Sequence, residues 1–133
     1  MKHIPVATKK RIEIIDVTSE INGMLRKLGI VRGICYLFVP HTTSGITINE
    51  NADPAVKQDI LETLERIAPA NRDYNHKEGN ADAHIKSSMI GVTLSLFVEN
   101  SRLVLGTWQS VFFCEFDGPR TRSLLLEVTP YER

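Results

Sequence analysis

Residues 92–128 read VTLSLFVENSRLVLGTWQSVFFCEFDGPRTRSLLLEV and contain four apolar runs separated by short polar segments. These runs predict four strands, at about 92–98, 103–107, 110–116 and 123–128. Glu99-Asn100-Ser101-Arg102 predicts a hairpin turn, and Gly118-Pro119 breaks the chain before the last strand. The end of the chain is therefore expected to be a series of strands.

Helices are predicted ahead of these strands. Apolar residues recur at helical spacing over about 18–28. Asp53 and Pro54 form a strong helix start, since an N-cap residue precedes a proline at the first helical position. After a loop at 68–79, Asn80 can cap a short third helix. Two or three helices are therefore expected.

Further strands are expected between these helices. Residues 12–15 form a short apolar run, 33–39 are nearly all apolar, and 45–50 alternate between apolar and polar. Pro40 ends the middle run and places His41 at its carboxyl end. Because strands cluster late while helices lie earlier, the pattern favours an α+β fold over a regularly alternating one. The expected architecture is a mixed, largely antiparallel β-sheet or sandwich packed by two or three helices.

Length and composition indicate one soluble domain spanning 1–133. Apolar residues make up 42% and charged residues 24%, with 16 basic and 16 acidic side chains. Zero net charge gives no broad case for nucleic acid or membrane binding, and no run approaches the roughly 20 apolar residues of a membrane helix. Cys35 and Cys114 lie in apolar runs and are expected to be buried thiols. A cytoplasmic protein is predicted.

Polar groups that could do chemistry concentrate in two segments. Residues 41–54 read HTTSGITINENADP, and residues 74–88 read YNHKEGNADAHIKSS. His41, His76 and His84 lie there, and three imidazoles suit Zn²⁺ with a position open for water or substrate. The alternative for His41 is a ring that hydrogen-bonds backbone at a strand end. The expected cofactor is a divalent ion, Zn²⁺ or Mg²⁺.

A second set of side chains suits phosphate. Lys86, Ser87 and Ser88 can present a cation and two hydroxyls to an anion, and Arg120 and Arg122 offer two more cations. Neither a GxxxxGK[ST] loop nor a GxGxxG fingerprint is present, so the motifs argue against ordinary nucleotide-binding folds.

The remaining candidates lie near the predicted late strands and helices. Glu115 ends an otherwise apolar row with Val111 and Phe113, which indicates a strand-end exception or part of a pocket. Gln109 can line a polar site while Trp108 serves as a core anchor. Asp82 flanks the histidines, where a carboxylate can orient an imidazole.

Three segments together resemble the secondary thiamine-phosphate synthase family. They are HTTSGITINENADP at 41–54, DYNHKEGNADAHIKSS at 73–88 and LGTWQSVFFCEFDGPRTR at 105–122, in register along nearly the whole chain. The resemblance implies an α+β homotrimer with a polar pocket that holds a metal or anion. It assigns to the family's characteristic positions His41, His76, His84, Asn51, Glu78, Asp82, Lys86, Ser87, Ser88, Trp108, Gln109 and Glu115.

The activity implied is the joining of a hydroxymethylpyrimidine diphosphate to a thiazole phosphate, with release of diphosphate. Lys86 with Arg120 or Arg122, and a divalent ion, would neutralise the departing diphosphate. Glu115, Gln109 and Asp82 would complete the catalytic set. The resemblance leaves open which arginine completes the site. In one common family variant a histidine-arginine pair follows the glutamate, but here Phe116-Asp117 follow Glu115.

Two other functions remain open from the residues. The first is a metal-dependent hydrolase or other phosphate-ester enzyme, in which the histidines activate water on a small phosphorylated substrate. The second is a non-catalytic ligand-binding trimeric module, favoured by the lack of an obvious pair of nucleophile and base.

Overall fold

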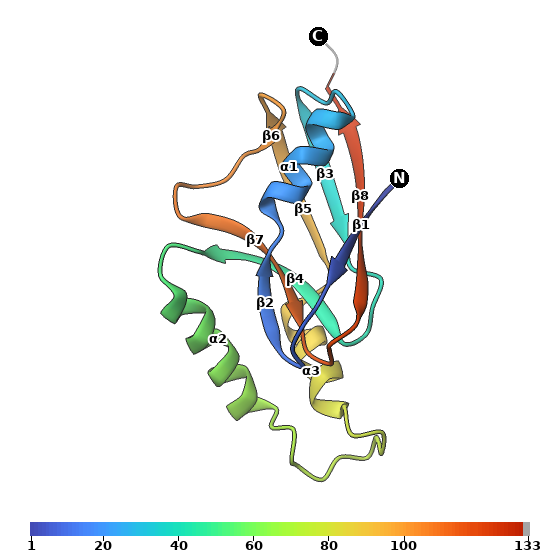
Figure 1. The fold of residues 1–133 in the computed structure, drawn as a ribbon, viewed down its shortest axis with the longest axis vertical. Helices are drawn as coiled ribbons and strands as arrows, with labels where there is room; N and C mark the ends of the chain where they lie inside the picture. Colours follow the sequence, from blue (N-terminus) through green and yellow to red (C-terminus); the bar gives the residue numbers. More distant parts are fainter. Residues whose placement is uncertain (132–133) are drawn as a thin grey trace.

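A computed structural model describes residues 1–131 and confirms the α+β class. In those residues eight strands form two sheets, and three helices accompany them (Figure 1). Every strand pair is antiparallel. Among residues 1–131, no helix is both long and apolar enough to cross a membrane.

The larger sheet has five strands in the order β1-β8-β3-β5-β6. Their bounds are Lys2–Ala7 for β1, Thr121–Pro130 for β8, Gly33–Phe38 for β3, Thr93–Glu99 for β5 and Arg102–Leu103 for β6. The smaller sheet has the order β2-β7-β4, with bounds Glu13–Asp16, Gln109–Glu115 and Ser44–Glu50. The helices are α1 at Thr18–Lys27, α2 at Pro54–Ile67 and α3 at Ala81–Ile90.

Strand β7 is buried on both faces, which explains its nearly continuous apolar sequence. Val111 and Phe113 belong to the main core, together with Ile21 and Leu25 of α1 and the inward residues of the larger sheet. Phe112 belongs to a second cluster that includes residues of α2 and α3. Cys35 and Cys114 are buried and free, as expected.

Most predicted elements are confirmed, with three differences. Strand β1 was not predicted, because Pro5 interrupts the alternation of Ile4 and Val6; β1 is an edge strand, where a missing N–H is tolerated. The strand expected over 103–107 is only two residues long. The cap expected of Asn80 is wrong, since its side chain instead bonds to neighbouring side chains.

The helix start at Asp53-Pro54 is confirmed. The Asp53 carboxylate accepts a hydrogen bond from the Ala55 N–H at 2.9 Å, and Pro54 is the first helical residue. The hairpin turn is also confirmed, with positive φ angles at Asn100 and Ser101. These local signals fix the elements, while the sheet register decides which side chains meet.

Candidate functional site

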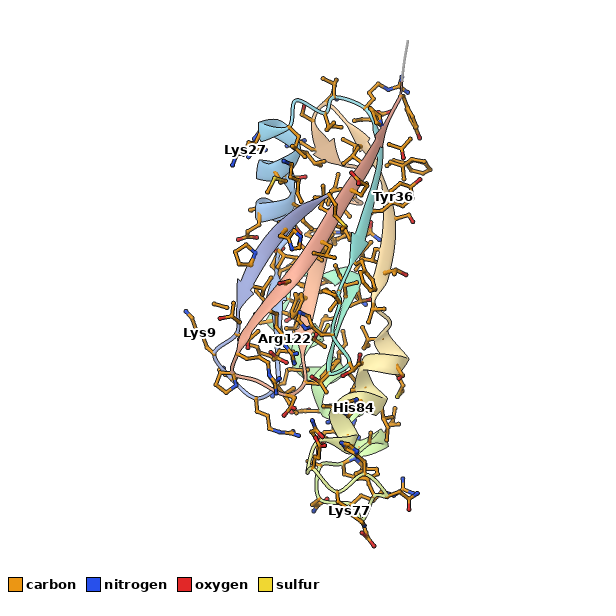
Figure 2. The ribbon with its side chains drawn as sticks, turned by 90° about the vertical axis from the view of Figure 1, so that its right-hand side faces the viewer. Lys9, Lys27, Tyr36, Lys77, His84 and Arg122 are labelled. Atoms are coloured by element: carbon orange, nitrogen blue, oxygen red, sulfur yellow. The ribbon has the colours of Figure 1, made fainter. Side chains whose placement is uncertain are left out.

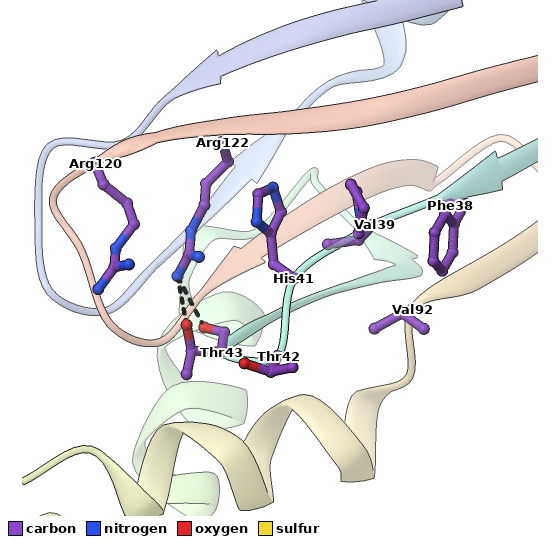
Figure 3. Close-up of a pocket in the computed structure, with 9 residues that line it drawn as sticks. Phe38, Val39, His41, Thr42, Thr43, Val92, Arg120 and Arg122 are labelled. Carbon is purple, nitrogen blue, oxygen red and sulfur yellow. Dashed lines mark hydrogen bonds between the residues drawn. The ribbon is translucent and has the colours of Figure 1, made fainter. Parts of the chain in front are cut away.

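A cavity of about 550 Å³ opens beside the loop that connects β3 to β4 and the start of β8. Figure 3 shows Arg120, Arg122 and His41 along this cavity, with Phe38 and Val92 at its other side. The complete lining is Phe38, Val39, Pro40, His41, Thr42, Thr43, Val92, Arg120 and Arg122.

Arg122 and Glu115 form a buried ion pair behind the cavity. Arg122 Nε donates to Glu115 Oε1 at 2.9 Å, and Arg122 Nη2 donates to Glu115 Oε2. Nη2 also donates to the hydroxyl of Thr43 at 2.8 Å. Burial by itself raises the pKa of Glu115, but hydrogen bonds from Arg122, Asp117 and Thr8 hold that pKa below its ordinary value. Glu115 is therefore an ionised group that holds Arg122 in place.

One nitrogen of Arg122 is left for a ligand. Within residues 1–131, Nη1 has no hydrogen-bond partner, whereas Nε and Nη2 are both used. Among those residues, Ser44 Oγ is the one side-chain polar atom that is fully buried and has no partner, so Nη1 is not in this class. Nη1 is consequently not fully buried, and it belongs to a side chain that lines the cavity.

His41 is fixed as a neutral donor. Its Nε2 accepts the backbone N–H of Ser123 at 2.9 Å, and a backbone amide can only donate. Burial and the nearby charge of Arg122 lower the pKa of His41. The neutral ring therefore carries its proton on Nδ1, which is free to donate to a ligand. This contact is the strand-end hydrogen bond to backbone that the sequence left open.

Arg120 lies at the rim of the same cavity. Its Nε donates to the carbonyl of Asp117 at 2.9 Å, and its Nη2 lies 3.1 Å from the Asp117 carboxylate. Asn80 donates to the same carboxylate at 2.9 Å, and His76 Nε2 lies 3.1 Å from Asn80 Oδ1. A chain of polar contacts thus links the loop at 68–79 with the rim.

A second cavity of about 380 Å³ adjoins the first and shares His41, Thr42 and Val92 with it. Its other wall is formed by His84, Ser87 and Ser88 of α3 and by Gly91 just after that helix. Figure 2 shows His84 below Arg122, toward the end of the molecule that carries Lys77. The serine protons are already used, because Ser87 donates to the Ser44 carbonyl and Ser88 to the His84 carbonyl.

The three predicted ligands, His41, His76 and His84, approach one another only in pairs. His41 and His84 line the second cavity, and the rings of His76 and His84 lie edge to face with centroids 5.1 Å apart. No three His, Cys, Asp or Glu side chains of residues 1–131 are grouped to hold a metal ion. Moreover, Nε2 of His41 already binds an amide. The side chains that the structure describes do not assemble a metal centre within one chain, and a divalent cofactor stays a prediction.

Lys86 and Asp82 lie on another side of α3. Lys86 Nζ donates to Asp82 at 3.1 Å and to Glu65 at 2.7 Å, while Arg11 binds both Asp82 oxygens. Although burial raises the pKa of Asp82, its bonds to Arg11 and Lys86 bring that pKa below the ordinary value. Neither side chain lines the two cavities. Their catalytic and phosphate-binding roles stay predictions.

Asn51, Trp108 and Gln109 lie at the opposite end of the smaller sheet. The register pairs Ser44 with Glu115 at one end of β4 and β7, and Glu50 with Gln109 at the other. Six residues of strand separate the two ends by about 20 Å. Trp108 is 64% exposed, so the expected core anchor is wrong. The structure does not bring these three residues to the cavities.

The site also uses residues that the sequence did not single out. Thr43 accepts from Arg122, and Thr8 contacts Glu115 from the end of β1. Helical periodicity could have shown that the polar residues of α3 lie on two different faces. Asp82 and Lys86 are four positions apart and share one face. His84 and Ser88 are also four apart, but they are shifted by two positions and so share another face. No comparable sequence signal marks Thr8.

Fold and site together define an α+β protein with a donor-rich cavity beside two arginines. The chain belongs to the UPF0047 protein YjbQ-like family, whose sequence model matches residues 2–131. It is 48% identical over 129 residues to UPF0047 protein YugU of Bacillus subtilis, covering 96% of this chain and 98% of that relative. A UPF0047 protein of Methanocaldococcus jannaschii is 46% identical over 123 residues, covering 92% and 89% of the two chains.

Solved structures agree with this membership. A crystal structure of a YjbQ/UPF0047 family protein from Clostridium acetobutylicum has a TM-score of 0.93 and 43% identity, covering 97% of this chain and 100% of that one. A conserved hypothetical protein from Thermus thermophilus has a TM-score of 0.92 and 42% identity, with the same coverage.

These findings correct the resemblance drawn from the three sequence segments. The matching family is UPF0047/YjbQ, and the relatives carry that name rather than the name of a thiamine-phosphate synthase. The assignment to the secondary thiamine-phosphate synthase family, and with it the description as a thiamine phosphate synthase-like transferase, is therefore wrong. The segments identify a real family, but the activity attached to them does not follow from the match.

Proposed function

We propose that this protein binds a small phosphorylated molecule in the cavity beside Arg122 and acts on its phosphate ester. The observation that supports this most directly is that the unpartnered Nη1 of Arg122 and the free Nδ1–H of His41 belong to two residues that line the same cavity. Arg120 adds a cation at the rim. Guanidinium groups match the geometry of phosphate oxygens, and hydrogen bonds to a charged acceptor are the strong ones.

The lining favours a ligand that brings acceptors. Glu115, the carboxylate behind the cavity, is already occupied by Arg122, Asp117 and Thr8. The free groups of Arg122 and His41 are both donors. A terminal phosphate has several acceptor oxygens and can meet them at once. Phe38 and Val92 would contact the carbon part of the same molecule.

His84 supports chemistry as well as binding. It lines the second cavity, which shares His41 with the first, so it would face the ester side of a bound phosphate. In hydrolysis, a water oxygen bonds to phosphorus and the ester P–O bond breaks. The electron pair stays on the leaving oxygen, which takes a proton from His84, and the water loses its proton to solvent. Proton transfer of this kind contributes typically 10²–10⁴-fold in rate, as an order of magnitude.

Binding is tested by calorimetric titration of inorganic phosphate and phenyl phosphate. Arg120→Gln removes the rim cation without removing a buried charge, so we expect affinity to fall about tenfold, the equivalent of one charge-assisted hydrogen bond. Arg66→Gln is the matched control, because Arg66 is an exposed arginine of α2 that contacts Thr63. Absence of saturable binding, or equal binding by wild type and Arg120→Gln, would contradict the proposal.

Turnover of phenyl phosphate separates an enzyme from a binding module. We expect His84→Asn to keep phosphate binding and to lose most phenol release. If wild type binds phosphate but releases no phenol, the non-catalytic module is the better description. The predicted divalent ion is tested by metal analysis of untagged protein, with His76→Ala and His84→Ala for comparison; unchanged metal content in both would end that prediction.

We also propose self-association in the cytoplasm. The outer face of the larger sheet carries Phe97, Tyr36 and Phe38, which are 62%, 42% and 43% exposed. Their exposed parts make about 300 Å² if each aromatic side chain offers about 200 Å², comparable to the largest apolar patch on a typical monomer. A homotrimer is tested by light scattering on wild type and Phe97→Glu. The two free thiols support a reducing compartment.

A further inference from the structure

We infer that Thr8, just after β1, is a positioning residue that sets the spacing of the two cavity arginines. The inference rests on the proposed anion site, because it concerns how that site is held. The Thr8 hydroxyl lies 2.8 Å from Glu115 Oε1 and accepts the backbone N–H of Arg120 at 2.9 Å. Glu115 in turn holds Arg122. One hydroxyl therefore connects with both arginines.

The direction of each hydrogen bond follows from the available protons. The hydroxyl has one proton and two acceptors within reach, Glu115 Oε1 and the Arg120 carbonyl at 2.9 Å. That carbonyl already accepts the Thr8 backbone N–H at 2.9 Å. The carboxylate is charged and forms the stronger bond, so the proton belongs to Glu115. The oxygen lone pairs then remain for the Arg120 N–H.

Thr8 reaches this position because the chain opposite lacks a side chain. A Cβ added to Gly118 would lie 2.8 Å from the Thr8 hydroxyl and 2.9 Å from Glu115 Cγ, and it would collide with the Lys10 carbonyl. Gly118 N–H also donates to the Arg11 carbonyl at 2.9 Å. The segment after β1 thus packs directly on the turn that carries Arg120.

The residues that hold the two arginines come from two separate parts of the chain. Asp117 contacts both Glu115 and Arg120, but it belongs to the same turn between β7 and β8. Thr8 is only 7% exposed and follows directly after the N-terminal strand β1. Its hydroxyl ties the turn to the larger sheet through a contact that spans more than one hundred residues of sequence. Without it, the Arg120 N–H loses its acceptor and Glu115 Oε1 loses a donor, and the Thr8 N–H bond to the Arg120 carbonyl no longer reaches the Glu115–Arg122 pair.

The test compares Thr8→Val, which keeps the shape and removes the hydroxyl, with Thr8→Ser, which keeps the hydroxyl. Thr18→Val is the matched control, because the Thr18 hydroxyl also accepts a backbone N–H, from Val111 at 2.8 Å, but within residues 1–131 it bonds to neither Glu115 nor the two arginines. Two quantities are measured: the Kd for inorganic phosphate and the Nε–Hε NMR signals of the two arginines without ligand.

We expect Thr8→Val to weaken phosphate binding about tenfold and to shift both arginine signals, since the Arg120 N–H loses its acceptor and Glu115, the partner of Arg122, loses a donor. Thr8→Ser should stay within about twofold of wild type, and Thr18→Val should change neither quantity. The inference fails if Thr8→Val matches wild type, if Thr8→Ser is as weak as Thr8→Val, or if Thr18→Val has the same effect. Thr8→Ala replaces Thr8→Val should that variant not fold.

The two proposals fail in different ways. If wild type does not bind phosphate, the proposed function is wrong, and the arginine signals still decide the role of Thr8. If wild type binds phosphate and Thr8→Val binds equally well with unshifted signals, the site stands and the role of Thr8 does not.

Discussion

Replacing Glu115 with glutamine tests the buried ion pair behind the cavity. Glu115 is completely buried and Arg122 is 3% exposed. Glutamine keeps the size of the side chain but removes its charge. It also turns one acceptor oxygen into an NH₂ donor, which would face the donors of Arg122 or Asp117. Breaking a buried pair by removing one partner costs about 3–5 kcal/mol.

That loss is large on the scale of a single domain. With net stabilities of about 5–15 kcal/mol, the variant would keep only part of its free energy of unfolding. A chain of this length loses about 4 °C in Tm for each kcal/mol, so we expect a drop of about 12–20 °C. Urea unfolding at pH 7, followed by circular dichroism, measures the free energy directly. Glu127→Gln is the control, because Glu127 is exposed and its charge contributes little.

The pH dependence gives a second check. The pKa of Glu115 is lowered in the folded protein, so protons bind more tightly to the unfolded chain. Its contribution is therefore present above the unfolded pKa of about 4.3 and is lost as pH falls through the folded pKa. The difference in stability between wild type and Glu115→Gln should shrink in acid. A difference that stays constant from neutral to acid pH, or a loss under about 1 kcal/mol at pH 7, would refute this account.

Three further predictions concern other parts of the molecule. Lys86→Met leaves buried Asp82 with Arg11 as its remaining cation among residues 1–131, so urea unfolding should show a loss of about 3 kcal/mol, and an unchanged midpoint would argue against a structural role for Lys86. Asp53→Ala removes the N-cap of α2 and should cost about 1 kcal/mol in thermal melts, with Asp53→Asn close to wild type. Trp108→Ala should change the free energy of unfolding in urea by less than about 0.5 kcal/mol, because the side chain is largely exposed. A larger loss in the monomer would contradict this prediction and would mean that Trp108 packs against the protein.

The α+β class followed from the sequence because its signals are local. The apolar run at 33–39 and the alternation at 45–50 specify strands through side-chain periodicity, and Asp53-Pro54 specifies a helix start through one capping bond. Strand β1 escaped prediction because Pro5 is compatible with a strand only at a sheet edge. Edge position is a property of the assembled sheet.

The sequence also marked site candidates that line the cavities: His41 at a strand end, where polar side chains often serve function, His84 on the short third helix, and Arg122 as a cation for phosphate. It could not decide which polar groups meet. The register of β4 and β7 sets Ser44 beside Glu115 and sends Gln109 to the far end, while the helical repeat of α3 turns Lys86 away from His84. Those pairings depend on packing between segments far apart in the chain. Residue types and their spacing therefore determined the elements and the candidate chemistry. Only the tertiary structure separated the cavity from the buried ion pairs of Lys86, Asp82 and Arg11. The reason is that contacts between distant segments leave no periodic pattern in the sequence.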